Sequence, residues 1–177
     1  MIDTQPGGPR SAFTSELIEL HETVLRMGTF VMGMLERGMQ ALVEQDLELA
    51  EEVRRSDDVA DALDIGIEEA ALKLLALQHP MASDLRAILS ISNIAAELER
   101  IGDYTEGIAN LAIKLSGQPF LKPLIDIPRI ADESSRMLTA SPEAFARHHV
   151  EAARALGDQD DTDDALYDHV PHTPPPL

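Results

Sequence analysis

The chain has 177 residues, of which 32 are acidic and 14 basic, so its formal net charge is -18. Such a surface repels phosphate backbones and anionic lipids, which argues against direct nucleic-acid binding. No cysteine is present and only 3% of the residues are aromatic. Disulfides and thiolate metal sites are therefore excluded, and the apolar area must come from aliphatic residues, a composition typical of packed helices.

Residues 1–10 are rich in Gly and Pro, show no signal-peptide pattern and are expected to be disordered. A first helix is predicted from about Ser11 to Gln45, because its apolar residues recur at alternating steps of four and three. These residues are Phe13, Leu17, Leu20, Val24, Met27, Val31 and Met34. Gly28, Gly33 and Gly38 weaken a helix, so we expect them where helices approach closely.

A second helix is predicted from about Asp46 to Gln78, and Pro80 ends it because the residue before a proline disfavours helical geometry. Its apolar positions are Leu49, Val53, Ala60, Leu63, Ile67, Ala71 and Leu74. A third helix is predicted from about Met81 to Leu115. Its seam comprises Leu85, Ile88, Ser92, Ala95, Leu98, Ile101, Thr105, Ile108 and Leu115. Three long helices joined by tight turns predict an antiparallel bundle over residues 11–118.

An internal repeat appears when the chain is shifted by 103 residues, which aligns residues 24–63 with residues 127–166. Identical pairs include Met34/Met137, Leu35/Leu138, Ala50/Ala153, Asp57/Asp160, Asp61/Asp164 and Leu63/Leu166. A partial second repeat is therefore expected over residues 124–170.

This second repeat is expected to contain two helices, from about Ile127 to Thr139 and from about Glu143 to Tyr167. The counterpart of Glu99 would lie at position 202, past the last residue, so the third helix is expected to be missing. We expect the C-terminal part to be the less stable one and residues 171–177 to form a disordered tail.

Side chains with oxygen donors, all of them acidic except Asn110, form lines on two of the predicted helices. Glu99, Asp103, Glu106 and Asn110 follow the spacing i, i+4, i+7, i+11 on the third helix, and Asp57, Asp61, Asp64 and Glu68 do the same on the second. The line on the third helix lies more than 90° from the apolar seam, so we expect it to face outward. Like charges one turn apart destabilise a helix, and a multivalent cation reverses that effect. Carboxylates suit hard ions such as Mg²⁺, Ca²⁺, Mn²⁺ and Fe³⁺.

Other interpretations of these acidic residues have to be weighed. The lines can be solvated surface, with Arg54, Arg55 and Arg100 pairing locally. The stretch from Asp158 to Asp168 lacks the glycine and the final glutamate of an EF-hand loop. No histidine stands three residues after a glutamate, as a ferritin-like di-iron site requires. No phosphate loop, nucleophile elbow or H-E-x-x-H motif is present, so the sequence does not predict an enzyme.

The stretch "LQHPMASDLRAILSISNIAAELERIGDYTEGIANLA", with the upstream "LELAEEVRRSDDVADALD", resembles the PhoU family. The resemblance covers about residues 13–168. It implies an all-α fold of three-helix repeats, here one complete repeat followed by an incomplete, apparently C-terminally truncated one. It also implies metal ions, with Mg, Mn, Zn or Fe as candidates, on carboxylates of an E(D)-x-x-x-D motif. In this chain the motif matches Asp57–Asp61, Glu99–Asp103 and Asp160–Asp164.

The same resemblance implies a function. PhoU proteins are negative regulators of phosphate uptake and of the phosphate-starvation response. They act in the cytoplasm, at the inner face of the membrane, as adaptors between the ATPase of the phosphate ABC transporter and a sensor histidine kinase, often as homodimers. The alternative for this chain is a non-catalytic, acidic interaction module without bound metal, which uses its negative surface to bind a basic partner.

Overall fold

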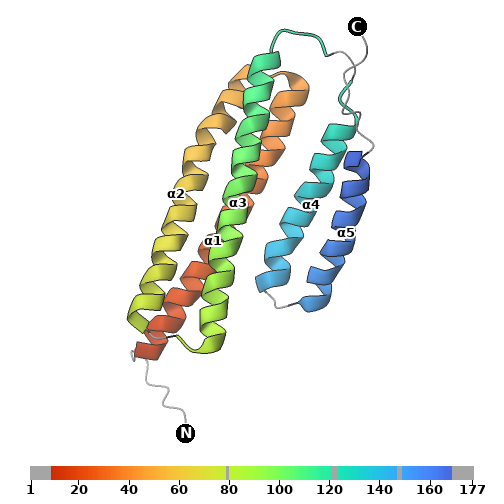
Figure 1. Ribbon diagram of the computed structural model, residues 1–177. Coiled ribbons are helices and arrows are strands. Elements are labelled where there is room, and N and C mark those ends of the chain that lie inside the picture. Colours follow the sequence, from red (N-terminus) through yellow and green to blue (C-terminus); the bar gives the residue numbers. More distant parts are fainter. Residues whose placement is uncertain (1–8, 79, 121–122, 147–148, 169–177) are drawn as a thin grey trace.

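The computed structural model describes residues 9–78, 80–120, 123–146 and 149–168, and within them the chain forms five helices and no strand (Figure 1). The helices are α1 (Pro9–Glu44), α2 (Leu47–Gln78), α3 (Ala82–Leu115), α4 (Asp126–Ala146) and α5 (Val150–Asp168). The predicted all-α fold is confirmed, and the ends of α1, α2 and α3 fall within two residues of the expected positions. In the part of the chain that the structure describes, no helix has both the length and the apolar character needed to cross a bilayer.

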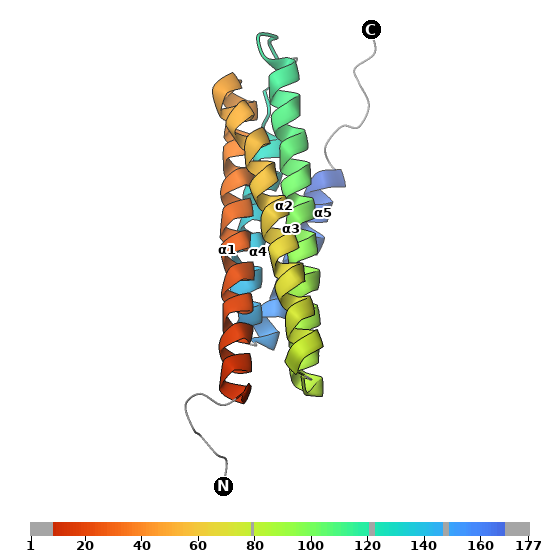
Figure 2. The same ribbon diagram turned by 90° about the vertical axis from the view of Figure 1, so that its left-hand side faces the viewer.

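Helices α1, α2 and α3 lie side by side as an antiparallel bundle, in which each helix packs on the other two (Figure 2). The seam predicted for α1 is confirmed, since Val24, Met27 and Val31 are fully or almost fully buried. Val53 and Ile67 of α2 are also buried. Leu85 is an exception: it lies in the first turn of α3, at the end of the bundle, and remains 39% exposed. Its assignment to the core was wrong.

The turn between α1 and α2 is hydrogen-bonded to the C-terminal end of α3 and to the loop that follows it. Gln45 adopts a left-handed backbone conformation with φ of 55°. Its side-chain amide donates to the carbonyl oxygens of Leu115 at 3.2 Å and Gln118 at 2.7 Å. Asp46 then caps α2, because its Oδ1 accepts a hydrogen bond from the backbone N–H of Leu49 at 3.0 Å. These contacts fix the register of the three helices at this end of the bundle.

The glycines of α1 have different surroundings. A β-carbon on Gly38 would lie 3.0 Å from Cγ2 of Thr105, so α1 and α3 approach closely there, as predicted. A β-carbon on Gly33 would meet no atom within 4 Å, so the same prediction was wrong for that position. Gly28 is buried. Only a glycine that faces another helix can mark a close approach.

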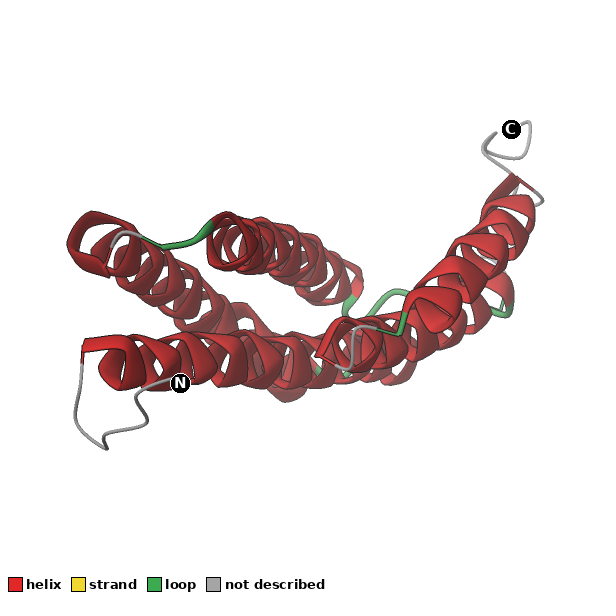
Figure 3. Cartoon of the chain, turned by 90° about the horizontal axis from the view of Figure 1, so that it is seen from below, coloured by secondary structure: helices red, strands yellow, loops and turns green. Residues whose placement is uncertain are grey.

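Helices α4 and α5 form a hairpin that is joined to the bundle through α4 and α1. The ring of Phe145 stacks on His21 of α1, with centroids 5.3 Å apart. Among the described helices α5 packs only on α4, and seen from below the hairpin projects away from the bundle (Figure 3).

The boundary between α4 and α5 differs from the expected one. Helix α4 continues through Pro142 to Ala146, whereas the sequence predicted a break after Thr139. Burial of Ala144 and the stacking of Phe145 on His21 favour the longer helix. His149, expected inside α5, instead caps it, because its Nδ1 accepts a hydrogen bond from the N–H of Ala152 at 3.1 Å. Of the ends expected to be disordered, residues 9–10 belong to α1, and residues 1–8 and 171–177 lie outside the described residues.

Candidate metal centre

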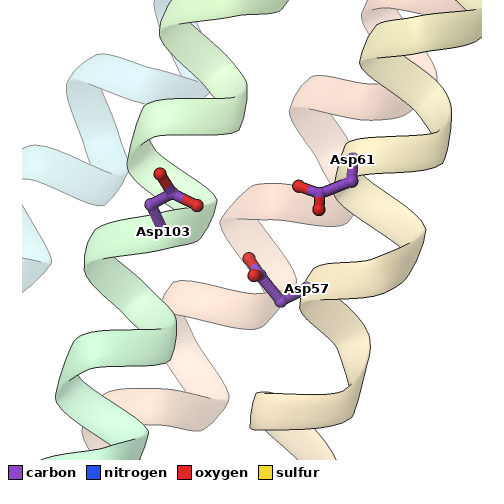
Figure 4. A group of neighbouring side chains, drawn as sticks. All are labelled: Asp57, Asp61 and Asp103. Carbon is purple, nitrogen blue, oxygen red and sulfur yellow. The ribbon is translucent and has the colours of Figure 1, made fainter.

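Three carboxylates from two helices converge on one side of the bundle. Asp57 and Asp61 lie one turn apart on α2, and Asp103 faces them from α3 (Figure 4). One oxygen from each side chain can be chosen so that all three lie within 4.8 Å of one another. The sequence placed these residues on two separate acidic lines, and the antiparallel packing of α2 and α3 brings the lines together.

The close contact of α2 and α3 at this site depends on small residues. A β-carbon on Gly102 would lie 3.4 Å from Cβ of Ala60 and 3.5 Å from Oδ1 of Asp57. Because neither Gly102 nor Ala60 has a long side chain, the α3 backbone comes near enough to shield the carboxyl group of Asp57 from solvent. Sequence reasoning missed Gly102, although a glycine directly before Asp103 was a signal for such a contact.

Asp57 is the least compensated group of the site. Its Oδ1 is buried and accepts no hydrogen bond from any described residue. Burial and, after it, the negative charges of Asp61, Glu106, Asp103 and Glu99 together raise the pKa of Asp57 from its ordinary 3.8 to about 6. A buried carboxylate oxygen without a donor is costly, and a cation supplies the missing positive charge.

Glu99 lies beside this group of three. Burial, followed by the charges of Asp103 and Asp61, raises its pKa, which places its carboxyl group near both. Burial, followed by the charge of Glu68, also raises the pKa of Asp64. The acidic line of α3 was expected to face outward. Asp103 is exposed, but Glu99 is half-buried and the line is turned toward α2.

Two arginines of this region, Arg54 and Arg100, form ion pairs with other carboxylates. Arg54 donates to Glu51 at 2.9 Å, and Arg100 donates to Glu97 at 2.6 Å. Both pairs join residues one turn apart on the same helix and are exposed, so they contribute little to stability. The negative charge of Asp57, Asp61 and Asp103 is thus left for another cation.

The three carboxylates fit a hard metal ion. Mg²⁺ binds oxygen at about 2.0–2.1 Å and Ca²⁺ at about 2.3–2.6 Å, so two ligands of one ion stand at most about 4–5 Å apart. The oxygens of Asp57, Asp61 and Asp103 lie within 4.8 Å of one another. This spread suits Ca²⁺ directly, and a smaller ion such as Mg²⁺ would draw the carboxylates slightly closer together. Glu99 could complete the set from the neighbouring turn, and water would supply the remaining ligands.

Of the two remaining candidate ligands, Asp160 does not join this group. Asp160 is an exposed residue of α5, which packs only on α4 among the described helices, so it belongs to a different part of the molecule. Asp164 is a residue of α5 whose side chain lies outside the described residues. The second metal site therefore stays a prediction from the repeat.

With this geometry established, the chain was compared with known proteins. The PhoU domain family matches residues 24–112, which covers α2, nearly all of α3 and more than half of α1. The chain belongs to the PhoU family. A phosphate-specific transport system accessory protein PhoU homolog of Aquifex aeolicus is 38% identical over 152 residues, which cover 86% of this chain and 69% of that protein. PhoU of Escherichia coli is 31% identical over 158 residues, which cover 89% of this chain and 66% of that protein.

Solved structures agree with these sequence relatives. The crystal structure of PhoU from Pseudomonas aeruginosa matches with a TM-score of 0.84 and 32% identity, over 88% of this chain and 75% of that one. The PhoU structure from Streptococcus pneumoniae matches with a TM-score of 0.80 and 30% identity, over 88% of this chain and 73% of that one. The family assignment made from "HPMASDLR" and "ELERIGD" is confirmed.

Proposed function

We propose that this chain is an accessory regulator of phosphate transport, which acts as a negative regulator of phosphate uptake and of the phosphate-starvation response. The main support is its 38% identity to a relative that is named a phosphate-specific transport system accessory protein. In this role it is a cytoplasmic adaptor between the ATPase subunit of a phosphate ABC transporter and a sensor histidine kinase. It works as a homodimer that reaches the inner face of the membrane through its partners, and it catalyses no reaction.

A metal ion is part of this proposal. The convergence of Asp57, Asp61 and Asp103 supports an ion held between α2 and α3, with Glu99 nearby. Such an ion would neutralise like charges on two helices and so hold them at a fixed distance. Mg, Mn, Zn and Fe ions are the candidates, and oxygen donors favour the harder ones. The ion would be structural, because its ligands come from two packed helices that it would hold together.

The first experiment tests the metal. Protein purified without chelator is analysed for bound elements and titrated with Mg²⁺, Mn²⁺, Zn²⁺ and Fe ions. The variant Asp57→Asn with Asp103→Asn should lose the bound ion. The matched variant Asp58→Asn changes an exposed carboxylate next to Asp57, outside the group of three, and should retain it. Equally low metal content in all three proteins would remove the ion from the proposal and leave the adaptor role intact.

The second experiment separates the adaptor from a plain acidic module. The net charge of -18 supports the alternative, in which the carboxylates only attract a basic partner. Binding to the purified ATPase subunit is measured at low and high salt, with and without EDTA. A metal-dependent adaptor should lose affinity in EDTA and keep most of it at high salt. The acidic module predicts the opposite pattern.

A further inference from the structure

A pocket of about 360 Å³ lies between α1 and α2, on residues that the candidate metal centre does not use. Among the described residues, its lining runs along α1 from Glu16 to Thr23 and along α2 from Ala62 to Leu74. Seven residues of helix rise by about 10 Å, so the pocket is an elongated groove about two turns of α1 long. A groove of this volume and shape suits a small linear molecule.

The floor of the groove is apolar and belongs to the core of the bundle. Leu20 and Leu74 are each 2% exposed, and Ile67 is fully buried. Leu63 is half-buried beside them. Gly66 leaves the groove open, because a β-carbon there would meet no atom within 4 Å. An aliphatic chain in the groove would therefore rest on packed apolar side chains and lose contact with water, which favours its binding.

The charged residues of the lining stand at the mouth of the groove. Glu16 and Glu19 lie one turn apart on α1, and Lys73 reaches Glu16 from α2. Nζ of Lys73 lies 3.6 Å from Oε1 of Glu16, and the two side chains are 62% and 36% exposed. Such a long, exposed ion pair contributes little to stability, so another cation can replace Lys73 at Glu16. Within the part of the chain that the structure describes, the carboxylate of Glu19 forms no ion pair.

Lys73 indicates which chemistry this groove accepts. Its side chain is an aliphatic stem that ends in an ammonium group, and it both lines the groove and pairs with Glu16. A free aliphatic amine has the same two parts and, like lysine, carries a proton at neutral pH. Because it is not tethered to α2, its chain can lie on the floor while its ammonium group contacts the carboxylates.

The charges around the groove favour a cation over an anion. Two carboxylates and one ammonium group line it, and the ammonium group is already paired. An anion would have to displace Glu16 from Lys73 while facing the negative charge of Glu19. Arg26 donates to Oγ1 of Thr23 at 2.8 Å, so the Thr23 end of the groove already has a positive charge nearby. The ammonium group of a ligand therefore belongs at the opposite end, beside Glu16.

We propose that this groove binds a small aliphatic primary amine. Its ammonium group contacts Glu16 and Glu19, and its chain passes Gly66 and lies on Leu63 and Ile67. Because the ligand touches α1 and α2 together, its binding stabilises the bundle as the free ligand concentration rises. The proposal uses no residue of the candidate metal centre and is independent of the phosphate-related role.

The test compares four compounds on the full chain by NMR of methyl-labelled isoleucine. Hexylammonium carries the charge and the chain, methylammonium the charge alone, hexan-1-ol the chain alone and hexanoate the opposite charge. Hexylammonium should shift the signal of Ile67 saturably and leave that of Ile65, an exposed neighbour outside the lining. Each of the other three should bind at least about fivefold more weakly. Equal affinity of any of them would overturn the proposal.

Variants then locate the ligand. Gly66→Leu fills the groove and should weaken hexylammonium binding at least about tenfold, whereas Gly107→Leu on α3, where a β-carbon also meets no atom within 4 Å, should leave it unchanged. Glu19→Gln should weaken binding at least about threefold, and Lys73→Met, which removes the competing ammonium group, should strengthen it at least about twofold.

The lysine variant distinguishes this site from general attraction to an acidic chain. Binding that fails to strengthen in Lys73→Met, or that stays the same in Gly66→Leu, would overturn the proposal. All four substitutions replace exposed residues, and circular dichroism of each variant confirms that the helices are retained.

Discussion

A β-carbon added to Gly102 on α3 would stand 3.5 Å from Oδ1 of Asp57 on α2. The carboxyl group at the centre of the candidate metal site is therefore shielded by the backbone of the opposite helix. The size of one residue controls both the distance between α2 and α3 and the solvation of Asp57.

Replacing Gly102 by Val should weaken cation binding. The methyl groups of Val extend beyond the β-carbon and would press on Ala60 and Asp57, which moves α3 away from α2. We expect a loss of about 1–3 kcal/mol in unfolding free energy and at least about tenfold in cation affinity. Gly107→Val is the matched control, because a β-carbon there meets no atom within 4 Å. Similar cation affinities of the two variants would contradict the role of Gly102.

The metal-free protein should lose stability as the pH rises from about 4 to about 6. The pKa of Asp57 is about 6 in the folded chain, above its ordinary value of 3.8, so the folded state holds a proton that the unfolded state has released. The pKa values of Glu99 and Asp64 are raised in the same direction. Because Asp57 is only partly buried, solvent reduces the loss to about 1 kcal/mol.

Urea unfolding in EDTA at the two ends of this pH range measures the effect. Asp57→Asn should flatten the pH dependence and make the metal-free protein more stable at neutral pH, since it removes a charge that is repelled by its neighbours. Asp58→Asn should leave the pH dependence as it is. A saturating cation should reverse the trend, because it binds the ionised carboxylates. An unchanged slope in Asp57→Asn would show that another group titrates.

Substitution by alanine should raise the stability of the chain at Gly33 and lower it at Gly38. Alanine favours a helix over glycine by about 1 kcal/mol, and Gly33→Ala should gain most of it because a β-carbon there contacts nothing within 4 Å. At Gly38 the new β-carbon would press on Cγ2 of Thr105 at 3.0 Å. Thr105 is fully buried and its hydroxyl donates to the carbonyl of Ile101, so its side chain has little room to move away.

Gly38→Ala should therefore destabilise the chain by about 1–2 kcal/mol. For a protein of this size that corresponds to a fall of roughly 2–8 °C in the melting temperature. Thermal unfolding of both variants under one set of conditions provides the comparison. Equal gains at the two positions would mean that α1 and α3 can separate at Thr105 without cost.

Gln45 should affect the stability of the fold in two separable ways, through its side-chain hydrogen bonds and through its left-handed backbone conformation. Alanine at this position removes the hydrogen bonds to Leu115 and Gln118 and keeps a side chain in the left-handed conformation. Glycine also removes the bonds but relieves the backbone strain. We expect Gln45→Ala to lower the unfolding free energy by about 2 kcal/mol and Gln45→Gly by about 1 kcal/mol. The reverse order in chemical denaturation would show that the strain at Gln45 is negligible.

The sequence alone determined the helices of the first repeat. Apolar residues at steps of three and four fix both the helical state and the buried face, so α1, α2 and α3 were predicted within two residues at each end. This succeeded because periodicity and turn signals are local properties. They were less informative farther along the chain: the sequence predicted a break after Thr139, yet α4 extends to Ala146, where Ala144 is buried and Phe145 stacks on His21 of the bundle.

Only the tertiary structure decided which acidic residues meet. Asp57, Asp61 and Asp103 were recognised as members of two lines, but a line on one helix carries no information about the rotation of its neighbour. The close contact at Gly102 and Ala60 sets that rotation and turns both lines to one point. The sequence likewise showed that Asp160 repeats Asp57, and packing decided that Asp57 faces α3 at Gly102 while Asp160 is exposed on α5. Contacts between helices depend on residues far apart in the chain, which local patterns do not report.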